Sequence, residues 1–218
     1  LNNQIRKSFK EEEIFRIDHY LGKEMIQNIE RLRFGNTIFE PLWNNKYISN
    51  IQITSSETLG IEDRGTYYES SGALKDMVQN HLLQMVSLLA MEVPSSRKSN
   101  DIRKEKVRVL KSLKSLKKEE IKQNFVRGQY DEGVINNETV LAYKDEPNVD
   151  SKSITETFVA GKIEIDNSRW SGVPFYIRTG KRMYKKAIQI VIEFKKNPMN
   201  IYYDTPEENE SNLLVINV

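Results

Sequence analysis

The sequence predicts an α+β fold in which helices pack on one face of a large, mostly antiparallel sheet. Up to Lys122, most apolar residues recur at the three- and four-residue spacing of helices. From Asn124 onward the pattern alternates, and strands follow one another without helices between them, which favours antiparallel pairing. The 218 residues are 38% hydrophobic and 29% charged, which is typical of a globular chain, and we expect residues 1–218 to form one domain.

Two helices are expected before the first strand. Residues 2–15 carry a thin apolar stripe, and residues 21–34 form an amphipathic helix that ends at Gly35. The apolar stripe of this second helix consists of Leu21, Met25, Ile29 and Leu32. The loop that follows contains Trp43, which we interpret as a packing anchor rather than a platform for a ligand.

A strand is expected over residues 47–54, where apolar side chains alternate with polar ones. The strand runs into polar residues and a glycine-containing loop, so Glu57 would stand at an edge of the sheet, where functional side chains are common. On the pattern alone, a solvent-exposed loop acid is the simpler interpretation of Glu57.

The segment 71–92 is the strongest helix prediction in the chain, because its apolar stripe is broad. The stripe consists of Leu74, Val78, Leu82, Met85 and Leu89. Asp76 and His81 lie where this buried helix emerges from the core. A histidine at such a position is more often a hydrogen-bonded core residue than a catalyst. A carboxylate on its second ring nitrogen would favour a neutral imidazole base, and Asp18 is the candidate partner.

Residues 95–122 are basic and helical, and the charges are better explained as a solvated face than as a nucleic-acid patch, because stacking aromatic residues are absent. The second half of the chain predicts strands at 125–130, 157–165, 174–179, 188–194 and 213–216. The polar link 131–153 is expected to be a mobile excursion.

The stretch 16–23 reads RIDHYLGK and combines an acid, an imidazole, a phenol and an ammonium. Because buried charges need partners, we interpret it as the lip of a pocket, with a strand up to Asp18 and then a turn into a helix. His19, Tyr20 and Lys23 can each donate a hydrogen bond to an anion, and His19 and Lys23 would share a helix face. Asp18 would repel that anion and should point elsewhere.

A second charged group follows the strand at 174–179. It contains five cations without an obvious matching acid: Arg178, Lys181, Arg182, Lys185 and Lys186. An anionic ligand or partner and a charged hairpin turn explain this group equally well.

Composition excludes several classes of protein. The net charge of +2 gives no reason to expect nucleic acid or an anionic membrane as a partner, and the absence of cysteine excludes thiolate chemistry and disulfides. No run reaches the roughly 18 apolar residues of a membrane span, and no signal peptide opens the chain, so we expect a cytoplasmic protein. Because the first residue is Leu1, we expect a piece of a longer polypeptide, truncated at both ends.

Three motifs, at residues 16–23, 75–84 and 173–181, resemble the glucose-6-phosphate dehydrogenase family. The resemblance covers nearly the whole chain, in order and with the family's spacing. It implies oxidation of glucose 6-phosphate at C1 to the lactone, the first step of the oxidative pentose phosphate pathway, with hydride transfer to NADP. The chain resembles the second, substrate-binding domain. A Rossmann domain with a glycine-rich turn should precede it and bind most of the NADP, and no such turn is present here.

The resemblance also implies roles for individual residues. His81 resembles the base that takes the C1 hydroxyl proton, and Asp18 resembles the carboxylate that orients it. Seven further residues resemble substrate-binding residues, for the phosphate and for the sugar hydroxyls: His19, Tyr20, Lys23, Glu57, Asp76, Lys181 and Lys186. The neighbouring Lys185 leaves the assignment of Lys186 open. The reaction needs no metal, because the nicotinamide accepts the hydride.

Two other readings stay open. A non-catalytic relative could bind sugar phosphate without turning it over, although such a protein needs no base. The chain could also be a dimerisation module, because family members usually form homodimers or homotetramers through the sheet.

Overall fold

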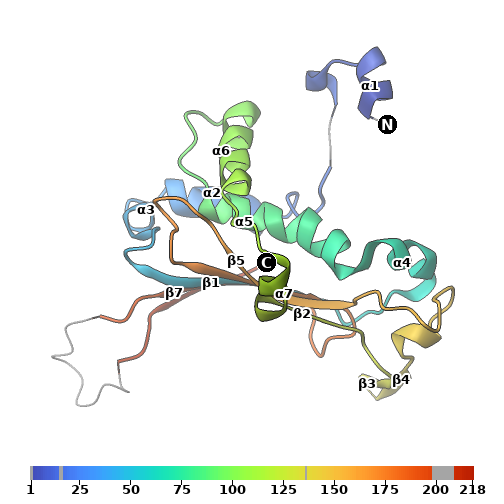
Figure 1. The fold of residues 1–218 in the computed structure, drawn as a ribbon. Coiled ribbons are helices and arrows are strands. Elements are labelled where there is room, and N and C mark those ends of the chain that lie inside the picture. The colour runs from blue at the N-terminus through green and yellow to red at the C-terminus, as the bar shows by residue number, and fades with distance from the viewer. Residues whose placement is uncertain (1, 15–16, 136, 198–208) are drawn as a thin grey trace.

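The computed structural model describes residues 2–14, 17–135, 137–197 and 209–218. It confirms the α+β class, with helices laid over one face of a six-stranded sheet (Figure 1). In spatial order the strands are β2 (Phe125–Gly128), β5 (Phe158–Glu164), β6 (Pro174–Gly180), β1 (Ile48–Ser56), β7 (Ala187–Phe194) and β8 (Leu213–Asn217). Neighbouring strands pair antiparallel except for β1 and β6, which run parallel.

The parallel pair arises because β1 is inserted between two strands that follow each other in sequence. The connection from β6 to β7 therefore crosses the end of β1. Two backbone hydrogen bonds fasten this crossing, from Glu57 N to Gly180 O at 3.0 Å and from Met183 N to Glu57 O at 2.8 Å. The crossing brings the residues that follow β1 and β6 to one edge of the sheet.

The helical segments occupy mainly the first half of the chain. They are α1 (Asn2–Ser8), η1 (Glu11–Glu13), α2 (Glu24–Phe34), α3 (Phe39–Leu42), η2 (Glu62–Arg64), α4 (Gly65–Ala73), η3 (Leu74–Leu82), α5 (Leu83–Ala90), α6 (Ser99–Lys111), α7 (Lys118–Asn124) and η4 (Tyr143–Asp145). The first helix is shorter than expected, and Phe15 and Arg16 lie outside the described residues.

Two of the predicted helices differ from the observed ones. Ile29 is buried and Leu21 and Leu32 pack against the core as predicted, whereas Met25 is 43% exposed and Ile26 and Arg33 are buried in addition. The basic segment 95–122 divides into α6 and α7, because Leu113 leaves the helix and bridges to Ile165 beside the sheet.

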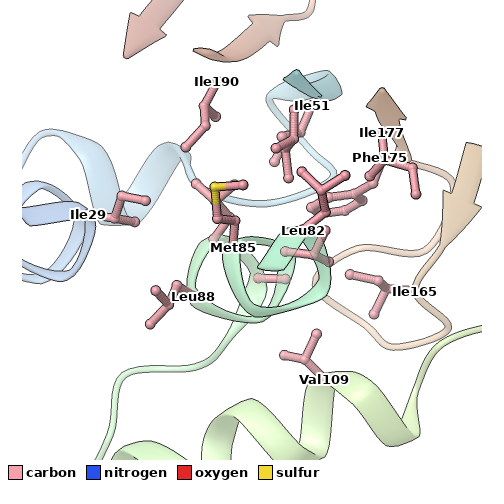
Figure 2. Close-up of a cluster of buried hydrophobic side chains, with 14 of the residues drawn as sticks. Ile29, Ile51, Leu82, Met85, Leu88, Val109, Ile165, Phe175, Ile177 and Ile190 are labelled. Atoms are coloured by element: carbon pink, nitrogen blue, oxygen red, sulfur yellow. The ribbon is translucent and has the colours of Figure 1, made fainter. Parts of the chain in front are cut away.

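The core lies between the sheet and the helices α2, η3, α5 and α6 (Figure 2). Labelled residues of this cluster include Ile29, Ile51, Leu82, Met85, Val109, Phe175, Ile177 and Ile190. Trp43 and Trp170 are fully buried, and their indole N–H groups donate to Leu89 O and Ala90 O at 2.8 Å. Trp43 is therefore a packing anchor, as the sequence predicts.

The strong helix predicted over residues 71–92 is kinked and changes its winding. Gly72 has a φ of 62°, which separates α4 from the rest, and η3 is a nine-residue π-helix that leads into α5. Glu156 caps the start of η3, with Ala73 N donating to its backbone oxygen at 2.9 Å and Leu74 N to its carboxylate at 3.1 Å. A wider winding of this kind is frequent at functional sites.

The link 131–153, for which the sequence predicted no regular elements, contains strands and a short helical turn. It contains the short strands β3 (Gly133–Ile135) and β4 (Glu138–Val140), which pair as a hairpin, with Asn136 outside the described residues. A second, small core anchors the link and consists of Ile61, Tyr68 and Tyr143, with Tyr130 and Val149 packed against them. Within the described ranges, no helix is long and apolar enough to cross a membrane.

Candidate active site

The centre of the site is the pair formed by His81, near the end of η3, and Asp18. The distance from His81 Nδ1 to Asp18 Oδ1 is 2.8 Å, and the two side chains are 6% and 12% exposed. The same carboxylate oxygen accepts the backbone N–H of Tyr20 at 2.9 Å, which fixes its direction. The expected contact between the histidine and the carboxylate is therefore present, and it engages one ring nitrogen of the imidazole.

The turn that carries Asp18 differs from the expected strand and helix. Ile17 and Asp18 have no regular structure, residues 19–22 form a turn, and α2 begins only at Glu24. Lys23 precedes the helix as its N-cap residue, so His19 and Lys23 do not share a helix face. Residues of this turn approach His81 because the chain folds back, with Lys23 N donating to Tyr20 O at 3.1 Å.

Three aromatic rings pack together at this turn. The Tyr20 ring stacks on His81 with a centroid distance of 4.2 Å and an interplanar angle of 15°. His19 meets both rings edge-on, at 4.8 Å from Tyr20 and 4.7 Å from His81. Lys23 Nζ lies 5.4 Å from the centroid of the Tyr20 ring. The four side chains thus form one group with an exposed imidazole, that of His19, at its surface.

Tyr20 connects this group to the end of β1. Its hydroxyl lies 3.0 Å from Ser55 Oγ, and both residues are buried. Burial raises the pKa of Tyr20, and the nearby carboxylates of Glu57 and Asp76 act in the same direction, whereas the hydrogen bond with Ser55 opposes them. The phenol therefore stays protonated at neutral pH and can donate a hydrogen bond.

A second group of charges lies at the edge of the sheet where β1 and β6 end. Ser56 and Gly180 are partners in the parallel register, so the next residue of each strand, Glu57 and Lys181, lie side by side. Lys181 Nζ is 2.5 Å from Glu57 Oε2 and 5.5 Å from the centroid of the Tyr68 ring. Lys181 is only 5% exposed.

The sequence indicated no matching acid for the five cations that follow or end β6. For two of them, Lys181 and Arg182, this was wrong. Lys181 pairs with Glu57, and Arg182 pairs with Glu146 at 3.1 Å. Glu146 belongs to the link 131–153, whose position in space could not be read from the sequence. Lys186 is exposed, and among the described residues its side chain makes no contact that would distinguish it from its exposed neighbour Lys185.

Asp76 lies on η3, five residues before His81. It is half-buried and accepts a hydrogen bond from the Tyr67 hydroxyl at 2.9 Å. The residues that sequence reasoning missed are Ser55, Tyr67 and Tyr68. Ser55 directly follows the predicted strand 47–54 and lies within the observed β1, but its burial beside Tyr20 depends on the fold, so no local signal identifies it.

One group of side chains in the described part of the chain has the composition of a metal site. Donor atoms of Asp18, His19 and His81 all lie within 4.8 Å of one another. Asp18 and His81 lie close together because they share a direct hydrogen bond, so their proximity does not require a metal ion.

Comparison with known proteins agrees with the motifs. The family model described as glucose-6-phosphate dehydrogenase, C-terminal domain, matches residues 30–218, which is most of the chain. The chain belongs to the glucose-6-phosphate dehydrogenase family. The model described as glucose-6-phosphate dehydrogenase, NAD binding domain, matches residues 1–28.

Curated relatives extend over the whole chain. Glucose-6-phosphate 1-dehydrogenase of Bacillus subtilis is 62% identical over 218 residues, which is 100% of this chain and 45% of the relative. The enzyme of Buchnera aphidicola subsp. Baizongia pistaciae is 51% identical over 216 residues, which is 96% of this chain and 44% of the relative. The chain therefore spans less than half the length of the curated relatives that it matches.

Solved structures give the same answer for the fold. A glucose-6-phosphate dehydrogenase in complex with its substrate glucose-6-phosphate matches with a TM-score of 0.87 and 37% identity, over 99% of this chain and 43% of that one. Glucose-6-phosphate 1-dehydrogenase from Mycobacterium avium matches with a TM-score of 0.85 and 38% identity, over 99% of this chain and 45% of that one. The predictions of family and fold class are confirmed.

Proposed function

We propose that the full-length protein containing this chain oxidises glucose 6-phosphate at C1 to 6-phosphoglucono-1,5-lactone. This chain would supply the sugar-phosphate site and the base. The observation that carries the proposal is the hydrogen bond between His81 and Asp18. With Nδ1–H donated to the carboxylate, the lone pair of Nε2 is free to take the proton of the C1 hydroxyl as the C1 hydride leaves and the carbonyl forms.

Asp18 has two parts in this proposal. It holds the imidazole in the tautomer that exposes a basic nitrogen, and its negative charge balances the imidazolium that forms when the proton arrives. The stacked ring of Tyr20 restricts rotation of the imidazole about its Cβ–Cγ bond, which supports the same geometry. A protein that merely bound sugar phosphate would have no use for this arrangement.

The remaining site residues fit a phosphorylated sugar. His19, Tyr20 and Lys23 are donors gathered at one turn, and we propose that they bind the phosphate, with Lys186 as a further cation. Glu57, Asp76 and Lys181 would bind the sugar hydroxyls. The carboxylate of Glu57 is already oriented by Lys181, which leaves its second oxygen to accept from a hydroxyl.

NADP would supply the acceptor for the hydride. This chain has no glycine-rich phosphate turn, and its match to the nucleotide-binding domain of the family is confined to residues 1–28, so most NADP contacts would lie elsewhere in the full-length protein. We propose that the substrate domain takes up residues 30–218 of this chain, because residues 1–28 match the model for the nucleotide-binding domain. Because both substrates are intracellular metabolites, we propose a cytoplasmic location.

We also propose that the protein forms a homodimer or homotetramer through its sheet. The helices cover one face, and the opposite face presents a row of residues in register across four strands: Tyr176, Gln52, Val191 and Val215. Tyr176 is 43% exposed and Val215 is 45% exposed, which gives this face an apolar character that a second copy could cover.

The direct test measures NADP reduction by the full-length protein with glucose 6-phosphate, and with NAD and unphosphorylated glucose as comparisons. We expect saturable turnover with the phosphate ester and much weaker turnover with glucose. Saturable binding of glucose 6-phosphate without any turnover would support the non-catalytic reading instead. Equal rates with glucose and its phosphate would contradict the assignment of the anion site.

A further inference from the structure

We propose that Arg182 and Glu146 are positioning residues that hold Lys181 against Glu57. This inference rests on the proposed function, in which Lys181 binds the substrate. It assigns the link 131–153 a role in shaping the substrate site. Neither residue is among those proposed to contact the sugar. They act through the turn that carries Lys181.

The backbone at Arg182 is the first part of the argument. Its φ is +54°, a left-handed conformation that a residue with a side chain seldom adopts without support. Arg182 N donates to Leu59 O at 3.1 Å, and the preceding residue donates from Lys181 N to Thr157 O at 3.0 Å. The left-handed residue reverses the chain directly after Lys181, so its stability decides where Lys181 points.

The side chain of Arg182 supplies the support. Its Nη2 lies 3.1 Å from Oε1 of Glu146, in a pair whose side chains are 19% and 6% exposed. Tyr130 donates its hydroxyl to the same carboxylate oxygen at 3.0 Å, and its ring centroid lies 5.8 Å from the guanidinium. Burial raises the pKa of Tyr130 to about 12, so the phenol remains a donor. A buried pair of this kind tolerates little displacement, because separation would leave both charges without partners.

Gly60 shows how closely the guanidinium is packed. A Cβ atom at Gly60 would lie 2.6 Å from Arg182 Nε and 2.9 Å from its Cζ. The loop after β1 therefore depends on a glycine to let the arginine reach Glu146. An alanine at this position would push the guanidinium away without altering a charge.

The same small core also supports Lys181 from the side. Tyr68 lies under the ammonium, its ring meets Tyr143 at 6.1 Å, and Tyr143 in turn meets Tyr130 at 5.7 Å. The rings connect Lys181 with the residues that surround Glu146. The link 131–153 thus braces the substrate lysine through an ion pair on one side and a row of edge-on aromatic contacts on the other.

The first test measures the accessibility of the Lys181 amine and needs no activity. Reductive methylation of the full-length protein, followed by mass spectrometry, should leave Lys181 protected, with Lys185 and Lys186 as exposed internal controls. In Arg182→Gln and Glu146→Gln, we expect methylation of Lys181 to rise about tenfold while the two controls stay unchanged, since one charge-assisted hydrogen bond corresponds to roughly this factor. Gly60→Ala should act in the same direction. Continued protection of Lys181 in all three variants would overturn the proposal.

The second test separates positioning from general stability. In Arg182→Gln we expect KM for glucose 6-phosphate to rise about tenfold with kcat within about twofold, and Arg182→Lys to restore most of the affinity. Arg33→Gln is the matched control, because it breaks the buried pair with Glu40 away from this turn and should lower the melting temperature without changing KM. If KM changed equally in Arg33→Gln and Arg182→Gln, the change would be explained by lower stability alone, and the positioning role of Arg182 would be overturned. If the unaltered protein does not turn over glucose 6-phosphate, the proposed function is wrong. The methylation experiment would still show whether Arg182 and Glu146 position Lys181, because it needs no activity.

Discussion

The imidazole of His81 is held from two directions, by Asp18 in the plane of the ring and by Tyr20 across its face. The first contact sets the tautomer and the second limits rotation, so the basic nitrogen has one direction in which to point. Neither contact requires the sugar to be bound. If His81 is the base of the proposed reaction, the site is preorganised where a loss of geometry would cost the most rate.

At this scale, His81→Asn in the full-length protein tests the base. We expect kcat to fall by about 10²- to 10⁴-fold, the usual contribution of a general base, while binding of glucose 6-phosphate is retained. Steady-state kinetics and calorimetry with the substrate measure the two quantities. A kcat close to that of the unaltered protein would show that another group takes the proton.

Lys23→Ala tests the phosphate site. Because the ammonium would contact the anion rather than the reacting carbon, we expect KM for glucose 6-phosphate to rise about tenfold, as for a lost charge-assisted hydrogen bond. The weak turnover of plain glucose should not change. If the variant loses affinity equally for both sugars, Lys23 does not recognise the phosphate.

Among the elements, the π-helix η3 and the kink before it determine how His81 and Asp76 are presented. Gly72 has a positive φ, and a Cβ at this position would lie 2.6 Å from the carboxylate of Glu156, the residue that caps η3. Local sequence shows a helix here and shows its buried stripe. It does not show the kink before η3, where the backbone is held by Glu156, which follows more than seventy residues later.

Gly72→Ala should therefore destabilise the protein by about 1–3 kcal/mol, the cost of a strained backbone position together with a steric clash. Gly133→Ala is the control, since it has open space around the added methyl group and should change stability by less than about 0.5 kcal/mol. Denaturant titrations of the two variants make the comparison. Equal stabilities would show that the kink is not constrained.

The link 131–153 is held by Glu69 as well as by its own core. Glu69 accepts hydrogen bonds from the Tyr143 hydroxyl at 2.5 Å and from Ser153 Oγ at 2.6 Å. Burial acts to raise the pKa of Glu69, but these hydrogen bonds outweigh it and the pKa is lowered. A carboxyl group whose pKa falls on folding stabilises the native state above its unfolded pKa, and that contribution is lost as the pH drops through the folded value.

Glu69→Gln should consequently lower stability at pH 7 by about 1 kcal/mol, and the difference from the unaltered protein should shrink below about pH 4. Thermal unfolding over this pH range measures it, and proteolysis of the link should become faster at pH 7. A difference that grows on acidification would contradict the lowered pKa.

For the molecule as a whole, periodicity predicted which residues form strands and that helices cover one face. It could not order the strands, because pairing partners are not encoded in local alternation. The position of β1 between β6 and β7 is the clearest case, and it is what brings Glu57 to Lys181. The sequence motifs identified both residues through family resemblance, while Ser55, Tyr68 and Glu146 became visible once the chain was folded.

The uncovered sheet face makes a prediction at this scale. If a second copy covers it, Tyr176→Glu combined with Val215→Glu should convert the full-length protein to a smaller species, since two charges would be buried without partners. Light scattering during gel filtration measures the mass. Tyr184→Glu, at a position that is 96% exposed and off the sheet face, is the control. An unchanged mass for the double variant would place any interface elsewhere.

The central position of β1 has a consequence for synthesis of the chain. β1 leaves the ribosome long before β6 and β7, the strands on both of its sides. Until Gly180 has been made, both edges of β1 lack their native partners, and the edge that pairs with β7 stays open until Phe194. Pairings over such long sequence separations form slowly, and exposed edges invite association with other chains. We therefore expect stalled or prematurely terminated translation products of this protein to depend on chaperones more than a chain with consecutive hairpins would.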